Sequence, residues 1–119
     1  GAGQWRGGIG TETIYTIGSD DTQFVTFGDG DFIPAFGLFD GQDSTLNSIV
    51  LTFPDGTEKT PNNKDLWTGV PKGTVYHQFA GGGGGYGDPK KRDREKLTAE
   101  IRDGLISEDA AKEIYGLGA

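Results

Sequence analysis

Residues 81–89 are Gly-Gly-Gly-Gly-Gly-Tyr-Gly-Asp-Pro, and this run limits how the chain can fold. Five consecutive glycines have no side chains to bury, so they cannot build a hydrophobic core. An ordered protein keeps such a run where the backbone takes positive φ angles or where another surface must approach very closely. That surface need not lie in this chain. We therefore expect Gly82, Gly83, Gly84 and Gly85 to be contacts for a partner.

The composition is that of one small acidic domain with little side-chain volume. The chain has 119 residues, of which 33% are hydrophobic, and 22 glycines. Its formal net charge of −7 opposes binding to nucleic acid and to anionic membranes. Cysteine is absent, so disulfides, thiolate metal sites and a cysteine nucleophile are excluded. No apolar run approaches the ~20 residues of a membrane span, and we expect a cytoplasmic protein.

The first two thirds of the chain have the pattern of short β-strands separated by turns. Residues 11–17 and 22–27 are rich in β-branched and aromatic side chains and are predicted to form a hairpin. Residues 47–53 are predicted to pair with residues 57–60 across a Pro-Asp-Gly turn, and a last strand is expected over 74–79. Strands at this spacing indicate a small antiparallel barrel or sandwich.

A glycine-rich and aspartate-rich segment, residues 28–41, interrupts this pattern and is predicted to be a long packed loop. Its phenylalanines, Phe32, Phe36 and Phe39, are candidate contacts with a partner or an aromatic substrate. Aromatic residues dominate cores and interfaces alike, so the alternative is that they form plain core. In the same segment Asp29 and Asp31 either bind a divalent cation or form a polar turn.

After Pro89 the apolar period changes to that of helices. Asp93 and Ser107 are predicted N-caps, and Gly104 and Gly116 are predicted to end the two helices. The predicted fold class is therefore mainly β, followed by two short C-terminal α-helices. The predicted domains are a glycine-rich β domain over 1–87 and a helical hairpin over 88–119, which packs on the β domain or on a partner subunit.

The polar residues do not assemble a recognisable active site. His77, the single histidine, lacks the partners of a catalytic triad or a metal site and is predicted to belong to the sheet. Arg6 and Asp88 are further candidate contacts with a partner subunit or substrate. Arg6 either grips an anion or forms a structural pair with an acid such as Asp88. The lysines and arginine of residues 90–92 are expected to be solvated. We predict no catalytic and no metal-binding residue in this chain.

Two motifs resemble the hydantoinase B/oxoprolinase family. The first is the run Gly82–Pro89 with the positions that follow it, namely Arg92-Asp93, Gly104, Ile106-Ser107, Ala110-Ala111 and Tyr115-Gly116. The second is the opening stretch, Gly1-Ala2-Gly3, Arg6-Gly7-Gly8 and Gly10. Together they cover essentially the whole chain, which is most similar to the small gamma subunit of acetophenone carboxylase-type complexes.

The resemblance implies a role in a complex of several chains. Its partners would be larger hydantoinase A-like and hydantoinase B-like subunits, and the complex would use ATP and a divalent cation, Mg²⁺ or Mn²⁺, that this chain does not bind. The implied reaction is ATP-dependent carboxylation of an acetophenone-like ketone by bicarbonate to a β-keto acid, with this chain in a structural role. The alternatives are a subunit of an ATP-dependent hydantoinase/oxoprolinase-type amidohydrolase and a free-standing β interaction module.

Overall fold

The computed structural model describes residues 1–118. Contacts divide it into two compact units that are both discontinuous in sequence. The β unit holds residues 10–34 and 46–81, and the glycine-helix unit holds residues 1–9, 35–45 and, among the described residues, 82–118. The division of the sequence into a β domain over 1–87 and a helical hairpin over 88–119 stays a prediction. Residue 119, the end of the predicted helical region, lies outside the described residues.

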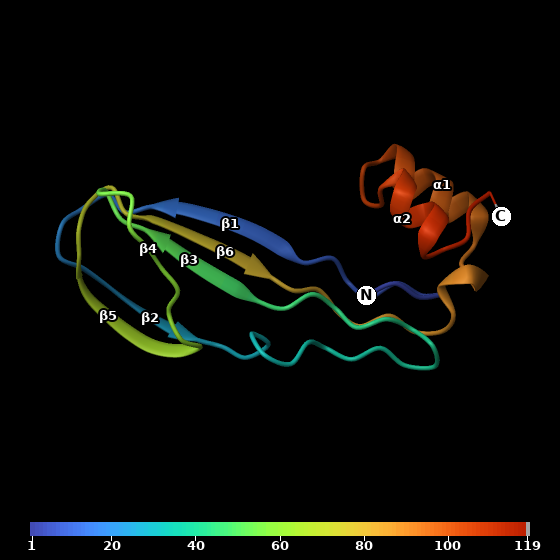
Figure 1. Ribbon diagram of the computed structural model, residues 1–119, viewed down its shortest axis with the longest axis horizontal. Helices are drawn as coiled ribbons and strands as arrows, with labels where there is room; N and C mark the ends of the chain where they lie inside the picture. The colour runs from blue at the N-terminus through green and yellow to red at the C-terminus, as the bar shows by residue number, and fades with distance from the viewer. Residues whose placement is uncertain (119) are drawn as a thin grey trace. The chain divides into compact units, whose positions relative to one another are not determined.

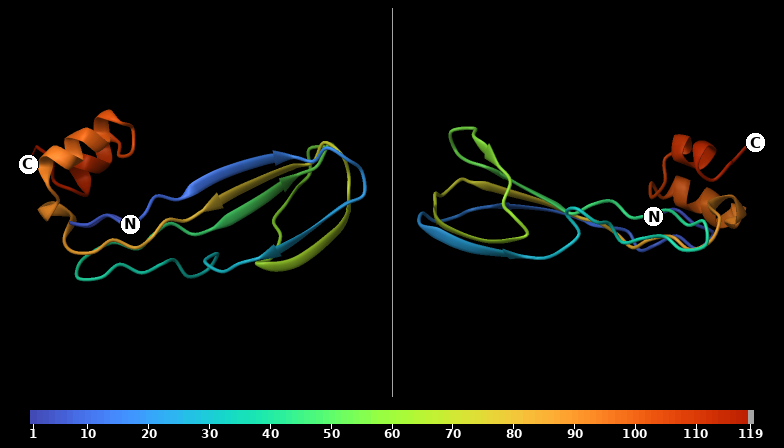
Figure 2. Two further views of the ribbon diagram at one scale, coloured as in Figure 1. Left: turned by 180° about the vertical axis from the view of Figure 1, so that it is seen from behind. Right: turned by 60° about the horizontal axis from the view of Figure 1, so that its bottom comes forward.

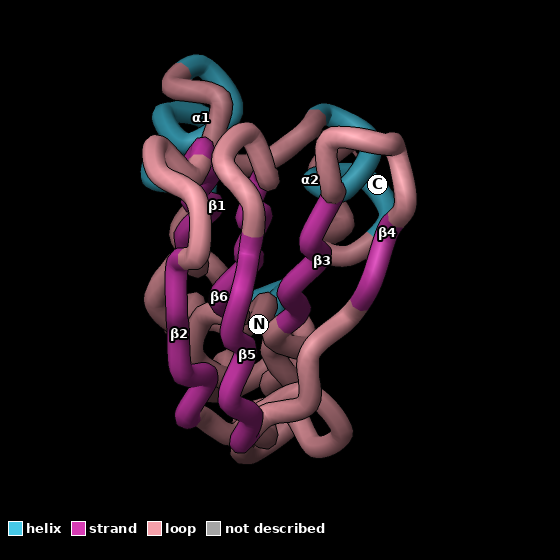
Figure 3. The backbone as a smooth tube through the Cα atoms, turned by 90° about the vertical axis from the view of Figure 1, so that its left-hand side faces the viewer, coloured by secondary structure: helices cyan, strands magenta, loops and turns pink. Residues whose placement is uncertain are grey.

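The β unit consists of two antiparallel sheets (Figure 1). A four-stranded sheet has the order β1-β6-β3-β4, and a two-stranded sheet pairs β2 with β5 (Figure 3). The strands are β1 (Thr11–Thr16), β2 (Thr22–Phe27), β3 (Ser48–Thr52), β4 (Glu58–Lys59), β5 (Lys64–Val70) and β6 (Val75–Ala80). The predicted mainly β class is confirmed. The sheets do not close into a barrel within residues 1–118.

The predicted hairpin between residues 11–17 and 22–27 is wrong, although both strands exist. β1 pairs with β6 and β2 pairs with β5, so the two strands lie in different sheets. Ile17 stays hydrogen-bonded to the turn before β6, since its N–H donates to Thr74 O at 2.8 Å and its carbonyl accepts from Gly73 N at 2.8 Å. The chain therefore passes from one sheet to the other instead of turning back along β1.

Aromatic side chains fill the space between these two sheets and explain the non-local pairing. Phe24 of β2 stacks on Trp67 of β5 with ring centroids 6.1 Å apart, and it meets Tyr76 of β6 edge-on at 5.7 Å. Leu51 and Val70 are buried beside them. A local hairpin of β1 with β2 would close a shorter loop, but it would separate Phe24 from these partners. The free energy gained by burying aromatic surface exceeds the loop-closure entropy that the shorter loop would save. β5 was not predicted because Lys64, Asp65 and Gly69 interrupt its β-type residues.

The helices of the glycine-helix unit begin and end where the sequence predicts. Asp93 caps α1 (Arg94–Arg102) by accepting a hydrogen bond from Lys96 N at 2.9 Å, and Ser107 caps α2 (Glu108–Glu113). A 3₁₀ turn, η1 (Pro89–Lys91), precedes them. Their small core consists of four buried side chains, Leu97, Ile106, Ala111 and Tyr115. Helices of this length are marginal in water alone, so this core holds them.

Three extended segments of the same unit, residues 1–9, 35–45 and 82–87, lie side by side (Figure 2). We call them the glycine layer. Their backbones are directly hydrogen-bonded: Gly85 N donates to Gln42 O at 2.8 Å, Leu38 N donates to Gly85 O at 2.9 Å, and Gly83 N donates to Gly8 O at 3.0 Å. The absence of glycine side chains thus lets the backbones of these segments pack directly against one another.

Close approach, not positive φ, explains the glycines at positions 84 and 85 of the run. None of Gly81–Gly85 is among the glycines with positive φ. A Cβ atom on Gly84 would lie 1.9 Å from Phe36 O, and one on Gly85 would lie 1.9 Å from Ala2 O. At these two positions the surface that needs glycine belongs to this chain, whereas the sequence suggested that it could belong to a partner.

We predict that Gly84→Ala destabilises the glycine-helix unit by about 3 kcal/mol or more, the upper end of the overpacking range, because the new methyl group meets a backbone carbonyl that cannot rotate away. The matched control is Gly8→Ala, since a Cβ there meets nothing within 4 Å. Urea unfolding followed by the circular dichroism of the helices, which belong to this unit, measures both variants. Equal unfolding midpoints for the two would contradict the assignment of Gly84 to close packing.

Candidate functional site

The glycine layer presents an aromatic face. Tyr86 pairs with Trp5 on one side and with Leu38 on the other, and residues paired directly across strands point to the same side of the layer. The Phe39 ring meets the Tyr86 ring edge-on with centroids 5.1 Å apart. Trp5 is 59% exposed, Phe39 70% and Tyr86 49%. We call these four residues, Trp5, Leu38, Phe39 and Tyr86, the aromatic face.

The aromatic face is suited to contact with another protein. Exposed apolar side chains that gather in one patch mark interaction sites, and Trp and Tyr are the residues most often responsible for binding energy at interfaces. Phe36, on the same segment, is 72% exposed. The alternative that Phe36 and Phe39 form plain core is therefore wrong for this chain, and contact with a partner or substrate stays a prediction.

Phe32 lies in the β unit, in a different place from Phe36 and Phe39. It is 85% exposed and lines a pocket of about 530 Å³ with Phe27, Tyr76 and several polar groups. Asp29 and Asp31 also line this pocket. Asp29 pairs with Lys64 at 3.2 Å, and Asp31 accepts a hydrogen bond from Asn63. These contacts agree with the polar-turn alternative for the two aspartates.

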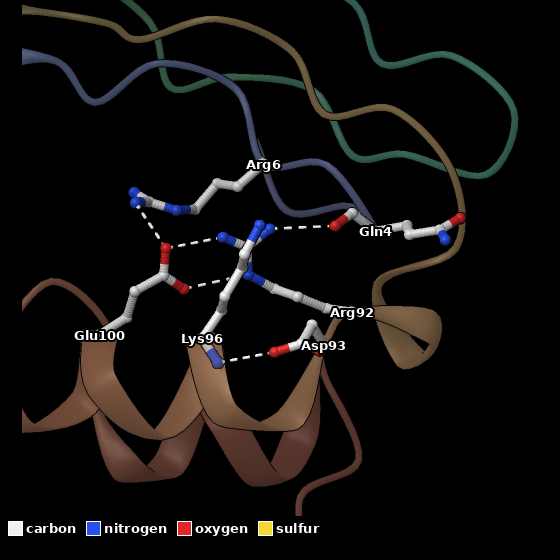
Figure 4. A network of polar contacts seen from close by, with 6 residues as sticks. All are labelled: Gln4, Arg6, Arg92, Asp93, Lys96 and Glu100. Carbon is white, nitrogen blue, oxygen red and sulfur yellow. Dashed lines mark hydrogen bonds and ion pairs between the residues drawn. The ribbon is translucent and has the colours of Figure 1, made fainter.

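Arg6 belongs to a partly buried charge network with Arg92 and Glu100 (Figure 4). Arg92 donates to both carboxylate oxygens of Glu100, from Nε to Oε2 at 3.0 Å and from a terminal nitrogen to Oε1 at 2.6 Å. A terminal nitrogen of Arg6 donates to the same Oε1 at 3.0 Å. Arg92 also donates to the carbonyl of Gln4 at 3.0 Å. The network therefore ties α1 to the opening segment of the glycine layer.

Two expectations about this region need correction. The acid that pairs with Arg6 is Glu100, while Asp88 caps η1 by accepting from Lys90 N at 2.9 Å. Arg92 is not a solvated side chain, because only 10% of it is exposed. Burial raises the pKa of Glu100, but hydrogen bonds and charge from Arg92 and Arg6 more than offset this, so the pKa lies below its usual value.

His77 and the remaining acids do not form a catalytic arrangement. His77 Nε2 lies 2.7 Å from Glu12 Oε1 on the neighbouring strand, and its ring packs on Phe79. Within residues 1–118 there is no group of three or more His, Asp or Glu side chains placed to hold a metal ion. In the same part of the chain, no helix has both the length and the apolarity that crossing a membrane requires.

The structure brings together some of the predicted site residues and adds others. Phe36, Phe39 and Gly82–Gly85 share the glycine layer, and Arg6 joins it to α1. Sequence reasoning missed Trp5, Leu38 and Tyr86 as a face, because their pairing depends on unpredicted contacts between distant segments. It also missed Glu100. The one available signal was an acid on the apolar side of α1, one residue before Ile101.

We predict that Glu100→Gln lowers the free energy of unfolding at neutral pH by about 3 kcal/mol, because it leaves two partly buried arginines without their carboxylate. Since the pKa of Glu100 is lowered in the folded chain, its stabilisation is complete above the ordinary pKa and is lost as pH falls from there through the lowered pKa of the folded state. The difference between wild type and variant should therefore shrink towards zero in acid.

Urea unfolding across a pH series measures this difference. Glu95→Gln is the control, because Glu95 lies on the same helix but forms no ion pair within the described residues, and its effect should stay within about 0.5 kcal/mol. A Glu100 variant whose deficit is independent of pH would contradict the role given to this carboxylate.

Comparisons with known proteins identify relatives over nearly the whole chain. The family model of hydantoinase B/oxoprolinase matches residues 1–89. The beta subunit of caprolactamase from Pseudomonas jessenii is 33% identical, with 98% of this chain and 21% of that subunit covered. One of the subunits of a putative D-/L-hydantoinase from Pseudomonas sp. (strain NS671) is 31% identical, with 97% and 19% covered. The chain thus spans about a fifth of the length of these relatives.

Solved structures give the same result. The crystal structure of ATP-dependent caprolactamase from Pseudomonas jessenii matches with a TM-score of 0.76 at 33% identity, over 98% of this chain and 21% of that one. A nucleotide-free acetone carboxylase structure matches with a TM-score of 0.65 at 19% identity, over 97% and 19%, and shares the fold. Because the family model matches most of the residues, glycine layer included, this chain belongs to the hydantoinase B/oxoprolinase family.

Proposed function

We propose that this chain is a structural part of an ATP-dependent enzyme assembly that acts on a carbonyl or amide compound. The observation that carries the proposal is the aromatic face, a set of large apolar side chains that are exposed in this chain. The chain spans only about a fifth of the length of its relatives. Exposing a surface of this kind to water is unfavourable, and a partner that covers it removes this cost. The partners would be larger hydantoinase A-like and hydantoinase B-like chains.

The catalytic groups of the assembly would lie mainly on those partners. Among residues 1–118, no cluster of acids and histidine suits a metal ion, so the Mg²⁺ or Mn²⁺ that accompanies ATP would be held elsewhere. His77 is paired with Glu12, and Arg6 and Arg92 share Glu100. The chain would contribute shape, a rigid backbone layer and contact area, and it would be inactive by itself.

A cyclic amide is the substrate class best supported. Two relatives at 31–33% identity are named for ring amides, a caprolactamase and a putative hydantoinase. Ketone carboxylation, in which bicarbonate and an acetophenone-like ketone give a β-keto acid, is the second candidate. Its support is the fold shared with acetone carboxylase at 19% identity. Sequence similarity therefore favours amide hydrolysis over the carboxylation that the sequence motifs first suggested.

The direct test is ATP hydrolysis by the assembly that co-purifies with this chain. We expect a lactam or a hydantoin to stimulate ATP hydrolysis, with release of the ring-opened amino acid or carbamoyl acid. Stimulation that requires both a ketone and bicarbonate would select the second candidate. A monomeric chain that recruits no larger protein, and that unfolds cooperatively alone, would contradict the proposal and favour a free-standing interaction module.

We predict that the double variant Phe36→Ser, Phe39→Asn loses the larger partners on co-purification, at least tenfold, because interface aromatics commonly contribute more than 1 kcal/mol each. Asparagine is chosen because Phe39 has a φ of 50°, which asparagine tolerates. The control is Leu105→Ser, an exposed apolar residue outside the glycine layer. Normal recovery of partners with a folded double variant would show that the partner lies elsewhere.

A further inference from the structure

A basic pocket of about 430 Å³ lies beside the glycine layer, where the opening segment meets η1 and the start of α1. Its charged lining comes from both ends of the sequence: Arg6, Lys91, Arg92, Lys96 and Asp93. From the sequence, the structural interpretation of Arg6 is preferred to anion binding because no second anion ligand accompanies it in the opening segment. The fold supplies three more cations from residues 91–96, so that objection no longer holds.

The local charge of this pocket is opposite to that of the whole chain. Four cations line it with one carboxylate, Asp93, and Glu100 adds a second carboxylate through its pairs with Arg6 and Arg92. These six groups leave a net charge of about +2, whereas the chain carries −7. Clustered like charges raise each other's potential, so an isolated basic pocket on an acidic protein attracts anions locally.

Hydrogen-bond donors in the pocket are only partly used. Arg92 uses one N–H group of each of its three nitrogens, in two hydrogen bonds to Glu100 and one to Gln4 O. Asp93 is also occupied, since it caps α1. Arg6 gives Glu100 a single hydrogen bond, and its buried Nε has no partner within the described residues. In the same part of the chain neither Lys91 nor Lys96 forms an ion pair.

We propose that this pocket binds a phosphate group, with Lys91 and Lys96 as the charged ligands and Arg6 as the buried donor behind them. Lys96 Nζ lies 5.5 Å from the centre of the Trp5 ring, which holds this ammonium at the rim next to an exposed aromatic surface. Arg92 and Glu100 are positioning residues that fix Arg6. A free phosphate and the phosphate of a nucleotide present the same chemistry, and Trp5 would add stacking for the second.

The test is an NMR titration of the full chain at low ionic strength, read at the Trp5 indole N–H and the Arg6 Nε–H. The probes are inorganic phosphate, AMP and adenosine. We expect phosphate to shift both signals. The double variant Lys91→Gln, Lys96→Gln should bind phosphate at least tenfold more weakly, because it loses charge-assisted hydrogen bonds. Equal binding of phosphate and AMP would indicate a phosphate site. Tighter binding of AMP than of phosphate, with no shifts caused by adenosine, would indicate a nucleotide site.

The matched control is Lys59→Gln, Lys64→Gln. These lysines also lie over aromatic rings, at 5.6 Å from Phe53 and Phe27, but they do not line the basic pocket, and phosphate binding should be unchanged. Shifts no larger than those caused by chloride at equal ionic strength would overturn the proposal, as would unchanged binding in the Lys91, Lys96 variant. A silent titration together with loss of co-purifying chains would assign these lysines to a protein interface and would also overturn it.

Discussion

Contact between bare backbones is the constraint on which the glycine-helix unit depends. Gly84 and Gly85 approach Phe36 O and Ala2 O so closely that a Cβ atom has no room, and the three segments of the glycine layer exchange backbone hydrogen bonds at these crossings. The arrangement satisfies the polar groups of segments that belong to no regular sheet, as burial requires. It also means that the layer has almost no side-chain core of its own.

A layer without an internal core places its large side chains on its surfaces. Trp5, Tyr86 and Phe39 therefore lie exposed on the aromatic face, while one edge of the layer is tied to α1 through Arg92 and its bond to Gln4 O. The small helical core and the charge network supply the remaining stability. The exposure of these aromatics follows from the packing of glycine and is not a separate feature added to it.

Local signals were enough for the caps, the turns and most strands. Asp93, Ser107 and Gly104 act as predicted because capping depends on residues within one helical turn. Pairing was a different problem. The turn-like residues 18–21 indicated a hairpin, yet Phe24 and Tyr15 each find aromatic partners far along the chain. The partner of Arg6 was missed for the same reason, because 94 residues separate it from Glu100.

The same physics explains why motifs in this chain indicated a family more readily than a reaction. Position 84 requires glycine because a Cβ atom there has no room. A motif built from such glycines therefore indicates how the backbone packs, not which reaction is catalysed. Reaction chemistry requires titratable groups that face a substrate, whereas the partly buried Glu100 is already paired with two arginines, which lower its pKa despite burial. A carboxylate held ionised in this way is a poor proton donor or acceptor near neutral pH. Its paired state makes it a structural element of the glycine-helix unit.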